Sequence, residues 1–169
     1  MICLNCQCIT PDKWNLISVE YVHNERVNAK FVCLTETWFR DGVNDGVSFS
    51  GYAKRASFSC SKNLGGGVAL WSKECLEVKE IDLKNICVEK HFEICGVEWL
   101  VAARRFVNLL CYRSSKVGNI DIFCDGLSEV LHRLYRSGSR LIITGDFNTD
   151  PIRDSRHLRG SWTSSVHTI

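Results

Sequence analysis

Five polar residues of this chain follow apolar runs and carry the side chains that metal and phosphate chemistry uses. They are Asn5, Glu36, Tyr112, Asp146 and Asn148. In α/β proteins ligands bind where strands end on one rim of a sheet, because the rigid strand fixes the side chain and the loop leaves room. Sequence does not give strand direction, so the convergence of these residues at one rim is a hypothesis.

These residue types suit a divalent cation and a phosphate. Mg²⁺ prefers oxygen ligands, and proteins usually hold it with only one or two carboxylates. Glu36 and Asp146 supply two carboxylates, for ligation and for a base. Asn5, Asn148 and Tyr112 have groups that hydrogen-bond phosphoryl oxygens or orient water. The alternative for each carboxylate alone is a helix cap or a turn after a buried strand.

The periodicity of apolar residues predicts an α/β fold rich in strands. Alternating or unbroken apolar stretches predict strands over residues 1–9, 31–34, 51–57, 68–71, 76–81, 86–95, 97–103, 106–112 and 140–144. Apolar residues at helical spacing predict helices over residues 13–27 and 120–136. Residues 41–50 are rich in Gly, Asp and Ser, which is typical of a surface loop.

The composition indicates one ordinary globular domain. Apolar residues make up 45% and charged residues 24% of the 169 positions, which excludes a disordered chain and a coiled coil. A net charge of +2 does not by itself indicate a nucleic-acid-binding protein. No signal-peptide pattern is present, and no apolar run approaches the roughly 20 residues that span a bilayer. We therefore expect an intracellular protein, nuclear or cytoplasmic, with no membrane partner.

The ten cysteines do not predict a metal site or a disulfide framework. Several lie inside apolar runs, where they act as small buried hydrophobic residues with reduced thiols. Cys3 and Cys6 form a C-x-x-C pair, but a structural zinc site needs four ligands and there is no second pair. Strand alternation would also place these two side chains on opposite faces.

Five motifs, in order, resemble those of endonuclease/exonuclease/phosphatase domains. They are Asn5 in Leu-Asn-Cys-Gln, Leu34-Thr35-Glu36-Thr37-Trp38, Gly65-Gly66-Gly67-Val68-Ala69, Tyr112-Arg113 and Gly145-Asp146-Phe147-Asn148. The chain most resembles the endonuclease domain of LINE-type (non-LTR) retrotransposons. The resemblance covers residues 1–150, and residues 151–169 are expected to form an irregular tail.

This resemblance implies an incomplete four-layer α/β sandwich and Mg²⁺-dependent phosphodiester hydrolysis, with Mn²⁺ as an alternative cofactor. By resemblance, Glu36 holds the metal and Asn5 helps to position it. Asp146 activates or orients the attacking water, and Asn148 contacts the scissile phosphate. Tyr112 also supports the phosphate.

The sequence departs from the family pattern at two places. Ser114-Ser115 follows Tyr-Arg, where the family often has Pro-Pro or a similar turn. The family also continues for several strands and closes with an Asp-His element, whereas His167 here lacks the preceding Asp. A sandwich without its last strands leaves an unpaired sheet edge, which predicts association or poor solubility. We therefore expect a truncated or decayed copy of a mobile-element nuclease.

Three functions stay open at this point. The first is an endonuclease that nicks DNA, with activity weakened or lost through the missing Asp-His element. The second is an inert remnant or interaction module, and the third is a phosphoesterase acting on a phospholipid or inositol phosphate. The Leu-Thr-Glu-Thr-Trp and glycine motifs favour the first over the third. Arg113 and Arg153, together with Arg156 and Arg159, are candidate contacts to a DNA backbone, with a solvated surface as the alternative.

Overall fold

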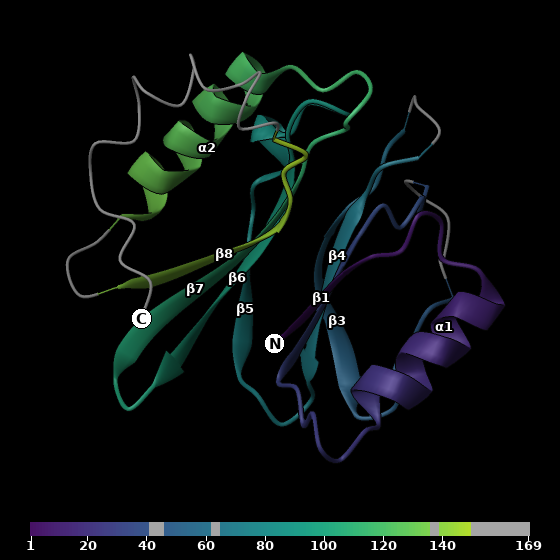
Figure 1. Cartoon of the computed structure of the whole chain (residues 1–169). Helices are drawn as coiled ribbons and strands as arrows, with labels where there is room; N and C mark the ends of the chain where they lie inside the picture. Colours follow the sequence, from purple (N-terminus) through teal and green to yellow (C-terminus); the bar gives the residue numbers. More distant parts are fainter. Residues whose placement is uncertain (41–45, 62–64, 136–138, 150–169) are drawn as a thin grey trace.

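The computed structural model describes residues 1–40, 46–61, 65–135 and 139–149. Within these residues, two four-stranded sheets pack face to face and a helix covers the outer face of each (Figure 1). The order of layers is helix, sheet, sheet, helix. The four-layer α/β sandwich expected from the sequence is confirmed over this part of the chain.

The first sheet combines one parallel and two antiparallel strand pairs in the order β1-β2-β4-β3. Its strands are β1 (Ile2–Asn5), β2 (Phe31–Thr35), β3 (Tyr52–Phe58) and β4 (Val68–Lys73). β1 runs parallel to β2, and β4 runs antiparallel to both β2 and β3. Helix α1 (Pro11–Ile17) and the π-helical turn η1 (Ser18–Val22) cover its outer face.

The second sheet has the order β5-β6-β7-β8, and its last pair is parallel. Its strands are β5 (Val78–Ile81), β6 (Glu93–Val101), β7 (Arg104–Tyr112) and β8 (Arg140–Asp146). A 3₁₀ turn, η2 (Lys84–Ile86), lies between β5 and β6. Helix α2 (Ile120–Leu134) packs on the outer face through Phe123, Leu127 and Val130.

Strand β2 shows how the sequence produces these layers. All five of its residues are buried, and successive side chains face opposite sides of the sheet. Val32 and Leu34 pack in the core beneath α1, whereas Phe31 and Cys33 pack between the two sheets. An unbroken apolar run therefore serves two cores at once, as expected for a strand that is covered on both faces.

The first helix begins and ends earlier than the predicted range of 13–27. Thr10 caps it, because its hydroxyl accepts a hydrogen bond from Lys13 N at 3.4 Å, and Pro11 takes the first helical position. The helical segment ends at Val22. Asn24 Oδ1 then accepts from Arg26 N at 3.0 Å and turns the chain.

Three other predicted segments differ from the structure. The opening strand ends at Asn5 rather than at residue 9, because Gln7 and Cys8 have left-handed φ values of 41° and 71°. The strands expected over 86–95 and 97–103 are instead one strand, β6, preceded by the η2 turn. It ends in a tight turn at Ala102 and Ala103, whose φ values of 48° and 64° suit a two-residue hairpin. The remaining predicted strands and the helix over 120–136 are confirmed, with ends that differ by at most two residues.

The predicted surface loop over 41–50 is only partly described, since residues 41–45 lie outside the described residues. Its last part contributes to the core, because Phe49 is buried and packs edge-on against Trp71. Arg153, Arg156, Arg159 and His167 also lie outside the described residues. Within the described part, β8 is the outermost strand of its sheet, and no helix is long and apolar enough to cross a membrane.

All ten cysteines are free thiols. Cys3 is exposed and Cys6 is buried, with its Sγ donating to the carbonyl of Thr35 at 3.1 Å. Burial raises the pKa of Cys6 to about 12, and the same cause raises the pKa of Cys33 to about 12. These two buried thiols are therefore poor nucleophiles near neutral pH.

We expect Phe123→Ala to lower the free energy of unfolding by about 3–5 kcal/mol, because it leaves a cavity beneath α2. Phe123 packs against Phe92 at 5.5 Å and Phe147 at 5.6 Å between ring centroids, so it joins the helix to the residue before β6 and to the loop after β8. Urea unfolding measures this cost. The exposed Val117→Ala should change stability by less than about 0.5 kcal/mol, and equal losses in both variants would contradict the assigned packing.

Candidate functional site

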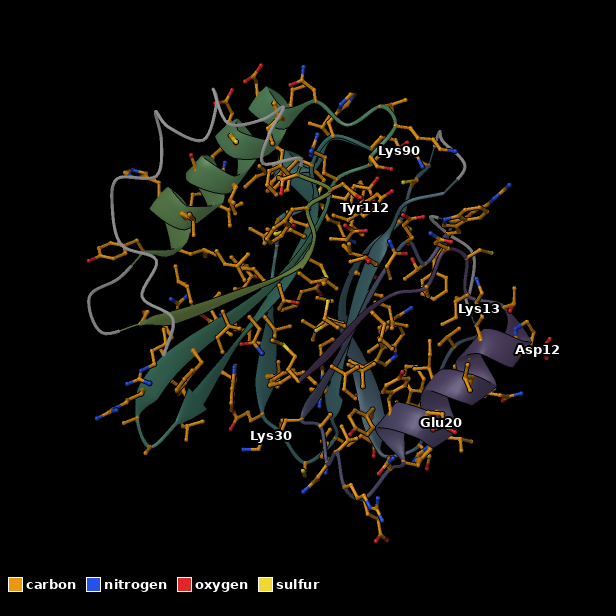
Figure 2. All side chains as sticks on the ribbon, viewed as in Figure 1. Asp12, Lys13, Glu20, Lys30, Lys90 and Tyr112 are labelled. Atoms are coloured by element: carbon orange, nitrogen blue, oxygen red, sulfur yellow. The ribbon has the colours of Figure 1, made fainter. Side chains whose placement is uncertain are left out.

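The carboxyl ends of four strands meet at one end of the sandwich. In the first sheet, Asn5 ends β1 opposite Thr35 of the parallel strand β2. In the second sheet, Tyr112 ends β7 opposite Asp146 of the parallel strand β8. Figure 2 shows Tyr112 at this end, with Lys30 at the opposite end of the molecule. The parallel pairs β1–β2 and β7–β8 therefore place the polar residues at their carboxyl ends at the same end of the sandwich.

The side-chain amide of Asn5 joins the two sheets. Its Nδ2 donates to Glu36 Oε1 at 3.1 Å and to Asp146 Oδ2 at 2.6 Å. Its Oδ1 accepts from the backbone N of Gln7 at 3.1 Å. That third bond fixes the orientation of the amide, so both hydrogens of its nitrogen point to carboxylates. Glu36 and Asp146, predicted to share one site, are thus brought to a single nitrogen atom.

Glu36 leaves the sheet through a strained backbone. Its φ of 54° lies in the left-handed region, which residues other than glycine adopt infrequently. The backbone around it is held by three hydrogen bonds: its carbonyl accepts from Cys8 N at 2.8 Å, Thr37 N donates to Gly67 O at 3.3 Å, and Trp38 N donates to Gly66 O at 2.8 Å. The carboxylate is therefore placed by the loops after β1 and before β4.

Tyr112 lies beside Glu36 in the space between the sheets and is only 4% exposed. Burial is the main cause that raises the pKa of Tyr112 well above its usual value, and the charge of Glu36 raises it further. Its hydroxyl has hydrogen-bond partners in Glu36 and Ser114. The phenol therefore keeps its proton at neutral pH and acts as a hydrogen-bond donor.

Asp146 is the last residue of β8, and Asn148 lies in the loop that follows it. Asp146 Oδ1 accepts from Asn148 N at 3.3 Å, and Asn148 Nδ2 donates to the carbonyl of Arg113 at 2.7 Å. The structure thus places the Asn148 amide against Arg113 rather than among the other four side chains. The predicted contact of Asn148 with a phosphate stays a prediction.

Arg113 supports this loop from within the protein. It is buried, and its guanidinium donates to Phe147 O at 2.9 Å, to Gly118 O at 2.8 Å and to Asn148 O. These bonds direct the charge onto backbone carbonyls of the chain itself. Its predicted contact with a DNA backbone stays a prediction, and the structure gives Arg113 a role in holding the loop that follows Asp146.

Gly145 lets β8 pass close to β7 just before Asp146. Its φ of 142° suits glycine, and a Cβ atom there would collide with the carbonyl oxygen of Cys111. The glycine of the Gly-Asp-Phe-Asn motif therefore permits a close approach of the two backbones. It brings Asp146 into register with Tyr112.

Glu93 is a buried carboxylate near the site that the sequence analysis did not select. It pairs in register with Tyr112 and is fully buried. It accepts hydrogen bonds from Gly67 N at 2.6 Å, Lys90 N at 2.7 Å and Cys60 Sγ at 3.2 Å. Burial raises the pKa of Glu93, and these hydrogen bonds oppose that shift. Through its bond to Gly67, this carboxylate of the second sheet holds the glycine loop (Gly65–Gly67), which precedes β4 of the first sheet.

The sequence feature that could have identified Glu93 as a buried carboxylate is its position as the one charged residue in the otherwise apolar stretch Phe92–Val97. Residues 86–95 are predicted to form a strand, and a glutamate suits the solvated face that such a strand commonly has. Only the pairing of β6 with β7 shows that the side chain points between the sheets, toward the glycine loop.

The carboxylate oxygens of Glu36 and Asp146 fit a hard divalent cation, and Asn5 orients both carboxylates through its amide nitrogen. Two negative charges converge on one amide nitrogen, and a cation would offset their repulsion. Among the described residues there is no group of three or more His, Cys, Asp or Glu side chains that could hold a metal. This donor set does not suit zinc, but it matches Mg²⁺, which keeps several water ligands beside one or two carboxylates.

Comparison with known proteins identifies the family of this chain. The family model described as "Endonuclease/Exonuclease/phosphatase family" matches residues 4–165. No curated protein matches the sequence.

Solved structures share the fold at low sequence identity. The endonuclease domain of TRAS1, a telomere-specific non-LTR retrotransposon, is 15% identical with a TM-score of 0.61, over 89% of this chain and 60% of that domain. The AP endonuclease LMAP from Leishmania major is 16% identical with a TM-score of 0.61, over 85% of this chain and 53% of that one. TDP2 from D. rerio, complexed with a single-strand DNA product, is 10% identical with a TM-score of 0.54, over 80% and 54%. The chain therefore spans about 53–60% of these three structures.

We expect Glu93→Gln to lower the free energy of unfolding by about 1–3 kcal/mol at neutral pH, because its NH₂ group would face a backbone donor. Burial makes native Glu93 keep its proton to a higher pH than the unfolded chain does. Its contribution to stability is therefore greatest below the unfolded pKa and is lost as the pH rises through the folded pKa. Urea unfolding between about pH 4 and pH 8 tests this, since the Gln variant lacks this contribution.

The matched control is Glu20→Gln, which changes an exposed carboxylate and should alter stability by less than about 0.5 kcal/mol. Identical pH profiles for the wild type and Glu93→Gln would contradict the perturbed titration of Glu93.

Proposed function

The chain belongs to the endonuclease/exonuclease/phosphatase family, and from this premise we propose that it is a divalent-metal-dependent phosphodiesterase that nicks DNA. The observation that supports the proposal most is the shared amide of Asn5, which joins Glu36 to Asp146. Phosphodiester hydrolysis needs a cation site and a base within reach of one phosphate. Two acids that face one nitrogen meet that requirement with residues from both sheets.

Glu36 is the residue that would hold the cation, Mg²⁺ or Mn²⁺, and Asn5 would help to position it. When bound, the cation would polarise a phosphoryl oxygen and offset the charge that develops on it. The Asn5 oxygen accepts from Gln7 N, and its nitrogen donates to Glu36. Asn5 therefore holds the Glu36 carboxylate in place on the side that faces Asp146.

Asp146 is the proposed base for the attacking water. Two N–H donors fix its carboxylate, Asn5 Nδ2 at one oxygen and Asn148 N at the other. A base whose orientation is fixed in advance takes a proton without first losing rotational freedom. The Arg113 bonds to the backbone of Phe147 and Asn148 hold the loop in that position.

Tyr112 is the proposed donor to the phosphate. Because burial and Glu36 keep its proton in place, the hydroxyl would add a hydrogen bond, and no negative charge, where the phosphate carries its own. Asn148 is proposed to contact the same phosphate from the loop after β8.

DNA is the proposed substrate on two grounds. The Leu34–Trp38 and Gly65–Ala69 motifs resemble those of retrotransposon endonucleases, and TRAS1 provides one of the similar structures. The similar D. rerio TDP2 structure contains a single-strand DNA product. Binding to a DNA backbone would weaken with salt, with a log–log slope of about −0.9 for each phosphate neutralised.

We expect calorimetric titration to detect Mg²⁺ binding to the wild-type protein, and Glu36→Ala to weaken that binding about tenfold or more, because it removes a carboxylate ligand. Asp12→Ala is the control, since Asp12 is an exposed carboxylate in the first turn of α1. Identical isotherms for the wild type and Glu36→Ala would refute the metal assignment.

We expect the wild type to nick supercoiled plasmid in the presence of Mg²⁺, and Asp146→Ala to reduce the rate by about 10²–10⁴, as removal of a general base does. Asp125→Ala, which alters an exposed carboxylate on α2, should nick at the wild-type rate. Equal nicking by the wild type and Asp146→Ala would contradict the assigned base. Nicking by neither, with phosphate release from an inositol phosphate instead, would favour the phosphoesterase alternative. Inactivity on both substrates would favour an inert fold.

A further inference from the structure

Trp38 presents an exposed aromatic ring beside the site. Of the four tryptophans that the structure describes, it is the exposed one, with 46% of its surface accessible. It follows Glu36 by two positions and has a left-handed φ of 59°. Its backbone N donates to Gly66 O at 2.8 Å, which fixes this conformation. The ring is therefore held in solvent by a strained, hydrogen-bonded backbone, next to a candidate metal ligand.

The Trp38 ring and the ammonium group of Lys90 both lie against the glycine loop. A Cβ atom at Gly65 would lie 3.2 Å from Trp38 Nε1, 3.3 Å from Trp38 Cε2 and 3.0 Å from Lys90 Nζ. The indole edge and the ammonium group thus lie against the same glycine, which has no side chain to keep them apart. Lys90 is in turn tied to the second sheet, because its backbone N donates to Glu93.

The charges around Trp38 indicate what would bind there. Figure 2 shows Lys90 at the same end of the molecule as Tyr112. A ring with an adjacent ammonium group complements a nucleotide, whose base is flat and whose phosphate is anionic. An anionic lipid surface fits less well, since its headgroups offer phosphates but no flat ring to stack on the indole. A base inside a duplex has both faces covered, so an unpaired base is the better match.

We infer that Trp38, Gly65 and Lys90 form a subsite that stacks one unpaired nucleobase of a DNA strand whose phosphodiester occupies the Asn5–Glu36–Asp146 site. The inference rests on the proposed function and specifies its substrate as a strand with an unstacked base near the cleaved bond. Trp38 supplies the stacking surface, and Lys90 supplies a positive charge for the adjoining phosphate. Gly65, which has no side chain, leaves room for Trp38 and Lys90 to lie next to it.

Binding of single strands, measured without divalent metal, tests this subsite separately from hydrolysis. Fluorescence anisotropy compares a labelled oligothymidylate of about ten nucleotides with an abasic strand of equal length, which has phosphates but no bases. The wild type should bind the oligothymidylate more tightly. Trp38→Ala should weaken its binding about tenfold and leave binding of the abasic strand unchanged, because stacking needs the base. Lys90→Ala should weaken binding of both strands.

Two control variants separate stacking from a folding defect. Trp38→Phe keeps an aromatic face and should retain most of the preference for bases. Tyr135→Ala removes another exposed aromatic ring, at the end of α2, and should bind both strands as the wild type does.

Equal binding of the oligothymidylate by the wild type and Trp38→Ala would overturn the subsite, whatever the result of the plasmid assay. Loss of abasic-strand binding in Trp38→Ala would overturn it too, because the ring would then act on the backbone. Trp38-dependent binding to vesicles of phosphatidylcholine and phosphatidylserine, with no preference for bases, would point to a lipid surface and also overturn it. A base preference that depends on Trp38, in a protein that does not nick plasmid, would support the subsite and reject the hydrolytic proposal alone.

Discussion

The bond between the amide nitrogen of Asn5 and the Asp146 carboxylate is the interaction on which the candidate site depends. It joins the edge strand of one sheet to the outermost described strand of the other. Glu36 shares the same nitrogen, so two like charges are held close by one neutral donor. This arrangement exists only while the two sheets keep their docking, which the apolar core between them maintains through residues such as Leu70, Val97 and Leu110. The geometry of the candidate site therefore depends on the apolar packing between the two sheets.

Two ionisable groups outside that contact stabilise the loops around it in complementary ways. Glu93 accepts a hydrogen bond from the backbone N–H of Gly67 in the glycine loop, and Arg113 donates to the carbonyls of Phe147 and Asn148 in the loop after β8. Both are buried, where an unpaired charge would be costly. Their hydrogen bonds offset that cost and leave the loops with defined conformations. Glu93 therefore helps to position Glu36 through the glycine loop, and Arg113 helps to position Asp146 through the loop after β8.

The sequence predicted the parts of this structure that local patterns determine. The short unbroken apolar run of β2 fits only a buried strand, and the long apolar stripe of α2, with its helical period, fits only an amphipathic helix. Polar residues at strand ends also marked Asn5, Glu36 and Asp146, because rigid strands deliver side chains to a rim. The hairpin turn at Ala102 was missed because alanine does not signal a left-handed conformation. Glu93 was missed because its burial depends on how two distant segments pair, which no local pattern encodes.

The separation of these residues along the chain has a consequence for how the protein forms. Asn5 and Asp146 are 141 positions apart, and their strands enter different sheets. Contacts between such distant segments close large loops, so they are slow to form and come late in folding. During synthesis, the first sheet can pair before β8 has left the ribosome, while Asn5 and Glu36 still lack the Asp146 carboxylate. The proposed site is therefore complete only after β8 has docked beside β7 and brought Asp146 to Asn5.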